Sequence, residues 1–114
     1  MYGTLLGMVG KRWYAVRCLF EIARGDQHIY EERITLWHAG SSEDAIDRAE
    51  PEATDYAGDE GDAYLGLAQS FELEAAPRDG AEVFSLMRDS DLAHDAYLDR
   101  FFRTGQERQG EYGT

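Results

Sequence analysis

The residues that could hold a metal ion are few and widely spaced. His28, His38 and His94 stand in three separate parts of the chain, and no two of them have the spacing of a zinc site. The acidic stretch at 59–62 lacks the alternating oxygen ligands of a calcium-binding loop. We therefore expect no metal site and no cofactor.

Covalent catalysis has no candidate residue either. Cys18 is the single cysteine, and its place in an apolar row predicts a buried, inert thiol. No serine stands in a G-x-S-x-G turn, and Gly7 and Gly10 precede a predicted strand, whereas a phosphate-binding loop follows one. Chance pairs of carboxylates are expected among 23 acidic residues, so such pairs have little diagnostic value. We predict no catalytic residue, and a non-enzymatic function is favoured.

The composition narrows the choice of partners. The formal net charge is −12, from 23 acidic and 11 basic residues. Such a surface repels phosphate backbones and anionic lipid head groups, so we expect no direct binding to nucleic acid or membrane. A basic protein partner fits this charge, and simple maintenance of solubility is the alternative explanation. One cysteine and the lack of a signal-like or membrane-spanning apolar run predict a cytoplasmic location.

Two strands are predicted near the amino end. In Trp13 to Ile22, the alternate residues from Tyr14 onward are all apolar, which indicates a strand with one buried face. A turn at Gly25-Asp26 separates it from a second strand over Ile29 to His38. In that second strand we expect Tyr30, Ile34 and Leu36 to face the core, and Arg33 and Trp37 to face away.

The remaining elements follow in order along the chain. Ser41 predicts the start of a helix whose apolar stripe is mostly alanine, with an interruption at Pro51. A third strand is predicted over Ala63 to Leu73, in which Gly66 could mark a bulge. A fourth strand over Glu82 to Met87 and a closing helix over Asp91 to Arg103 complete the set.

These elements predict an α+β fold. The order β-β-α-β-β-α favours a two-layer sandwich, with a mainly antiparallel four-stranded sheet and both helices on one face. A β-grasp-like arrangement is the alternative. Residues 12–105 would form the single domain, residues 1–11 a flexible leader and residues 106–114 a mobile polar tail.

Several segments resemble one known family. The segments WYAVR, FEI, YEERITLW, VFSLMRDSDL and AYLDRFF, with the Ala-rich acidic helix, are similar to the small bacterial family catalogued as domain of unknown function 4288. The resemblance covers about residues 12–105. It implies a compact intracellular domain and no catalytic residue, because that family has no activity that could be carried over.

The predicted sheet leaves an aromatic and basic surface opposite the helices. It would contain Trp13, Arg17, Arg33 and Trp37, with Tyr64 nearby. Trp, Tyr and Arg dominate interface energetics, so this surface predicts binding to another protein or to a second copy, as a homodimer. An adaptor or an immunity-like inhibitor of a basic enzyme are two such roles. Packing that merely covers an open sheet is the structural alternative.

A different class of function stays open. A small-molecule-binding domain or a small enzyme could have a pocket between sheet and helices. Such a pocket would lie near Tyr14, Tyr30, Tyr56 and Tyr97. Tyrosines at these places are also common as core residues whose hydroxyl groups reach the surface.

Overall fold

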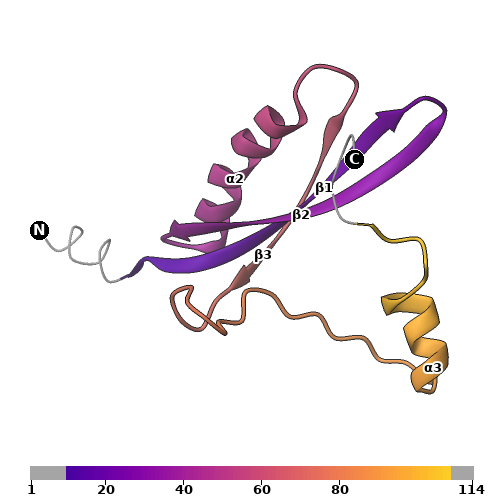
Figure 1. Ribbon diagram of the computed structural model, residues 1–114. Coiled ribbons are helices and arrows are strands. Elements are labelled where there is room, and N and C mark those ends of the chain that lie inside the picture. The colour runs from indigo at the N-terminus through magenta and orange to yellow at the C-terminus, as the bar shows by residue number, and fades with distance from the viewer. Residues whose placement is uncertain (1–9, 109–114) are drawn as a thin grey trace, which may run out of the picture.

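The structure is a computed structural model that describes residues 10–108. A three-stranded antiparallel sheet is covered on one face by a single long helix (Figure 1). Residues 74–108 then leave the sheet as an extended arm. The predicted leader, apart from residues 10 and 11, lies outside the described residues, as does the tail beyond Arg108.

The sheet is built around the first strand. β1 (Arg12–Arg24) lies in the centre and pairs antiparallel with β2 (Gln27–Ala39) on one side and β3 (Ala63–Glu72) on the other. Gly25, with a φ of 62°, and Asp26 form a two-residue turn, so that Arg24 pairs with Gln27. A positive φ at the first turn position suits glycine and the twist of a hairpin. The predicted place of the turn is confirmed, but the longer loop expected over residues 23–28 is wrong, because Ala23 and Arg24 already pair with His28 and Gln27.

One helix covers the sheet. α2 (Ser42–Ala57) begins after Ser41, whose Oγ accepts a hydrogen bond from the Asp44 N–H at 3.0 Å. The Asp44 carboxylate in turn accepts from the Gly40 N–H at 3.1 Å, so the predicted cap is present. The split predicted near Glu50 is wrong, because one helix continues through Pro51. Ala49 and Ala53, on either side of Pro51, are both packed in the core.

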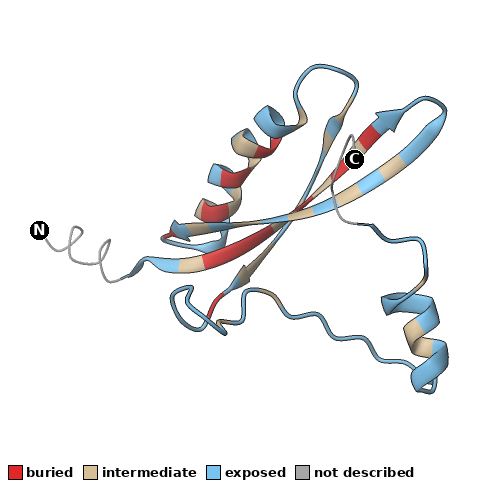
Figure 2. Ribbon diagram, in the orientation of Figure 1, coloured by how far each residue is buried: buried red, intermediate tan, exposed pale blue. Residues whose placement is uncertain are grey.

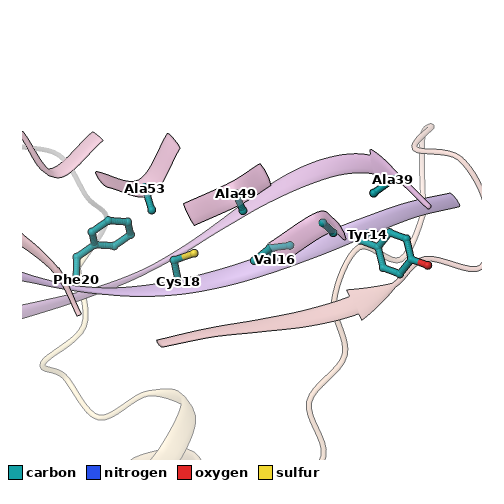
Figure 3. Packing of buried hydrophobic residues seen from close by; sticks show 8 residues of the cluster. Tyr14, Val16, Cys18, Phe20, Ala39, Ala49 and Ala53 are labelled. Atoms are coloured by element: carbon teal, nitrogen blue, oxygen red, sulfur yellow. The ribbon is translucent and has the colours of Figure 1, made fainter. Parts of the chain in front are cut away.

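The core lies between β1 and α2. Figure 3 shows Cys18 and Phe20 of β1 on the side of Ala49 and Ala53 of α2, and Tyr14 beside Ala39 of β2. Tyr14, Val16, Cys18 and Phe20 are each at most 5% exposed, and they confirm the predicted apolar row. Because the helix presents Ala45, Ala49 and Ala53, little side-chain volume separates it from the sheet.

The predicted four-stranded sandwich is wrong. Residues 82–87 run extended but form no strand, and within residues 10–108 only β1 has two strand neighbours, both antiparallel, so the β-grasp alternative fails as well. The segment carries apolar side chains on both of its faces, which suits a strand covered on both sides. This sheet is covered on one face only.

The closing helix is shorter than predicted and does not cover the sheet. It consists of α3 (His94–Tyr97) continued by the π-helical η1 (Leu98–Phe102). Figure 1 shows this helical segment standing away from the sheet at the end of the extended arm. Figure 2 shows that buried residues gather on β1 and on the near side of α2, whereas the arm is mostly exposed.

Candidate protein-binding surface

The five predicted binding residues do not share one face of the sheet. Strand pairing places Trp37 beside Tyr14 and Arg33 beside Cys18, and Tyr64 of β3 lies beside Phe20. Side chains of directly paired residues point to the same face. Arg33, Trp37 and Tyr64 therefore lie on the helix-covered face.

Trp13 and Arg17 lie on the opposite face, which no helix covers in the described part of the chain. The expected grouping is therefore wrong. So is the expected core position of Ile34 and Leu36, which share the uncovered face.

Arg33 fastens the second strand to the helix. Its two terminal nitrogens donate to the two carboxylate oxygens of Glu52, both at 2.8 Å, and its guanidinium lies 3.8 Å from the centre of the Tyr56 ring. The Tyr56 hydroxyl donates to the Glu31 carboxylate at 2.9 Å. The hydrogen bonds from Arg33 lower the pKa of Glu52, and those to Glu52 raise the pKa of Arg33. These groups close the rim of the core.

Trp37 and Tyr64 also have structural partners. The Trp37 indole N–H donates to the Thr35 hydroxyl at 2.7 Å, and the Arg48 guanidinium lies 5.5 Å from the indole ring. The Tyr64 hydroxyl donates to Glu50 at 2.5 Å, and burial raises its pKa far above the usual range. Half-buried positions with satisfied polar groups indicate side chains that hold the helix on the sheet.

The uncovered face of the sheet, here called the open face, has an apolar centre. Leu67 is 60% exposed, Ile34 41% and Leu36 38%. Leu19 and Phe71, both half-buried, complete the apolar centre across the three strands. Scattered apolar residues are common on protein surfaces, but a contiguous group across one sheet face indicates an interaction site.

Arg17 lies in the middle of the open face. Its guanidinium donates to the Gln69 side-chain oxygen and lies 3.4 Å from the Glu32 carboxylate. It also lies 4.9 Å from the centre of the Phe84 ring. Phe84 belongs to the extended chain after β3, and its ring packs against Phe71. A shallow depression of about 400 Å³ surrounds this group, lined by Arg17, Leu19, Glu32, Leu67, Ala68 and Gln69. At one end of the face, Trp13 stacks on His38 with ring centres 4.8 Å apart.

β3 has a bulge next to Leu67. The pairing of β1 with β3 shifts between Cys18 and Phe20, near Gly66, whose φ is 78°. The bulge suggested by Gly66 is thus confirmed. Sequence reasoning missed Leu19 and Leu67 as surface residues. Their signal was the alternation of side chains, since Leu19 has the parity of Arg17 in β1 and Leu67 has the parity of Phe71 in β3.

The four tyrosines of the alternative pocket are not brought together. Tyr14 is buried in the core, Tyr30 is 59% exposed on the open face, and Tyr97 lies in the distant helical segment. A cavity of about 250 Å³ at the end of α2 is lined by Tyr56 but by none of the other three. No ligand-sized pocket is therefore formed jointly by these tyrosines.

The described residues contain no cluster of side chains that could bind a metal ion. Across residues 10–108, no three His, Cys, Asp or Glu side chains converge in a way that could hold an ion. Asp62, from the acidic turn, instead accepts a hydrogen bond from the Ala23 N–H at 3.0 Å. Burial raises the pKa of Cys18, which keeps its thiol protonated and unreactive.

Comparison with known proteins found no match among protein-family models, curated proteins or solved structures. The resemblance to domain of unknown function 4288 therefore stays a prediction. No helix in the described chain has both the length and the apolar character needed to cross a bilayer.

Proposed function

We propose that this protein is a non-enzymatic binding module that docks another protein on the open face of its sheet. The observation that supports this most is that the apolar residues Leu19, Ile34, Leu36 and Leu67 share the open face on the three strands around Arg17. An apolar centre with a polar rim is the usual anatomy of a protein interface. Arginine and aromatic side chains at the centre of such a surface supply much of the binding energy.

The charge of the chain favours a basic partner. Glu21, Glu32 and Tyr30 flank the apolar centre, and the protein as a whole carries a net charge of −12. Complementary charge speeds association and selects the partner. An adaptor, or an inhibitor of a basic enzyme, is the corresponding role. The single buried cysteine suits the cytoplasm, which we keep as the proposed compartment.

A matched pair of variants tests the open face. Leu67→Asp places a charge in the apolar centre, and Thr54→Asp places the same charge on the exposed outer side of α2. In affinity capture from the native lysate, we expect partners retained by the wild type to be retained by Thr54→Asp and lost from Leu67→Asp. Equal capture by both variants, or no capture by the folded wild type, would contradict the proposal. Circular dichroism confirms that each variant is folded.

A further inference from the structure

The chain has a second apolar surface without a partner in the described residues. We call residues 74–108 the C-terminal arm. Phe84 contacts the sheet, with its ring centre 5.8 Å from that of Phe71. Beyond this point Met87 is 89% exposed and Phe102 75%. Within residues 10–108, the helical segment at 94–102 packs against no other helix or strand.

The arm is held away from the body. The radius of gyration is 17.4 Å, against about 13 Å for a compact domain of 100 residues. Figure 1 shows the extended chain after β3 carrying the helical segment clear of the sheet. One chain thus leaves bare both an apolar sheet face and an apolar helix, joined by an extended connection. This is the form of a protomer whose terminal element is exchanged with another copy.

We propose that the helical segment of each arm covers the open face of a second copy, which makes the protein an arm-exchanged homodimer. This rests on the proposed function of the open face as a docking surface, and it goes beyond that function by naming a second copy of the chain as an occupant that would compete with a basic partner. Phe84 would remain on its own sheet, and the residues after it would cross to the partner. The two contacts would be identical and related by twofold symmetry.

The available area is sufficient for a stable dimer. With about 200 Å² per large side chain, a figure for aromatic residues that serves as an upper value for the others, the exposed fractions amount to at most roughly 450 Å² on the open face and roughly 600 Å² on the arm after Phe84. Two exchanged contacts would bury on the order of 2,000 Å², which is the range of stable interfaces. The side chains counted are Tyr30, Ile34, Leu36, Leu65 and Leu67 on the sheet, and Leu86, Met87, Leu92, Phe101 and Phe102 on the arm after Phe84.

The part of the arm that would cross is far less acidic than the body. Residues 10–73 carry 14 acidic and 6 basic side chains, whereas residues 85–108 carry five acidic and four basic ones. A contact between arm and sheet therefore meets less like-charge repulsion than a sheet-to-sheet contact between two acidic faces.

Cross-linking between differently labelled copies tests the exchange. The only native thiol, Cys18, is buried and inert, so new cysteines can be placed without removing it. We would mix the full-length variants Leu67→Cys and Phe102→Cys and add a short thiol-to-thiol reagent. Exchange predicts a covalent species of twice 12.9 kDa that joins one copy of each variant. Leu67→Cys mixed with Gln106→Cys, outside the aromatic stripe, should give much less.

A second measurement follows the dimer itself. Light scattering should give twice 12.9 kDa for the wild type and for Gln106→Glu. Phe102→Glu, which changes a side chain 75% exposed in the single chain, should raise the dissociation constant about tenfold or more while leaving the fold intact.

Three outcomes would overturn the exchange. The first is a dimer unaffected by Phe102→Glu, and the second is a cross-link confined to single chains of a Leu67→Cys/Phe102→Cys double variant. Both would leave the binding role of the open face standing. A strictly monomeric wild type that still captures another protein through Leu67 would also reject the exchange alone.

Discussion

Single side chains on the covered face hold the helix to the sheet and have no binding role in this account. Arg33 and Trp37 were expected at the surface for recognition. The structure instead shows Arg33 paired with Glu52 and Trp37 beneath Arg48. Their long apolar stems and rings cover the core, while their polar ends find partners at its rim.

The pairing of Arg33 with Glu52 predicts a pH-dependent stability. The pKa of Glu52 is lowered in the folded protein. Its ionised carboxylate therefore contributes to the free energy of unfolding at neutral pH, and this contribution is lost as the pH falls through the lowered pKa. We expect Glu52→Gln to reduce the free energy of unfolding by about 1 kcal/mol at pH 7, a modest figure because the pair is partly exposed.

The difference in the free energy of unfolding between the wild type and Glu52→Gln should shrink below pH about 4.3 and vanish in stronger acid. Urea unfolding at a series of pH values measures this free energy. Glu74→Gln, at an exposed carboxylate, is the control and should match the wild type within about 0.5 kcal/mol. A constant deficit of Glu52→Gln across the whole pH range would show that the carboxylate contributes by shape and not by charge.

The sequence determined the inward side chains of β1 but not those of β2. In β1 the large apolar residues occupy one parity without interruption, which identifies the core face, although Ala15 on the other parity is also buried. In β2, Ile34 and Leu36 lie on one parity and Trp37 on the other, and the apolar pattern alone cannot decide. The two-residue turn at Gly25-Asp26 sets which face of the sheet each β2 side chain is on, because a shift of one residue in the pairing of β1 with β2 would move every side chain to the other face.

At the scale of elements, the bulge in β3 shapes the open face. Gly66 adopts a φ of 78°, which L-residues rarely adopt, although an added Cβ would meet nothing within 4 Å. Gly66→Ala should therefore lower the free energy of unfolding by about 1 kcal/mol or more through backbone strain alone.

Gly40→Ala is the matched control for the bulge. Gly40 also has open space around it but no positive φ, so its replacement should have little effect. Chemical denaturation of both variants compares them. Equal stability of Gly66→Ala and the wild type would mean that the bulge does not require this backbone conformation.

Helix α2 and the first three strands could be predicted from the sequence because each has an uninterrupted local signal. The fourth strand could not, since residues 82–87 have strand-like composition but no sheet edge that needs their two apolar faces. The closing helix was recognised by its aromatic stripe. Its position away from the sheet depends on the path of the extended arm, which local pattern does not encode.

For the molecule as a whole, two apolar surfaces and a long arm are combined in a chain of 114 residues. The covered face contains the core, and the open face is the surface on which we propose association. Docking of another protein and exchange of arms between two copies both use the open face. A second copy and a different protein would therefore compete for Leu67 and its neighbours. Exchange of arms would then regulate access of other partners to this face.

The most direct test of the open face is the molar mass of three forms measured by light scattering at the same micromolar concentration. We expect twice 12.9 kDa for the wild type and for Thr54→Asp, and 12.9 kDa for Leu67→Asp. A Leu67→Asp variant that keeps the mass of the wild-type dimer would contradict the assignment of association to this face.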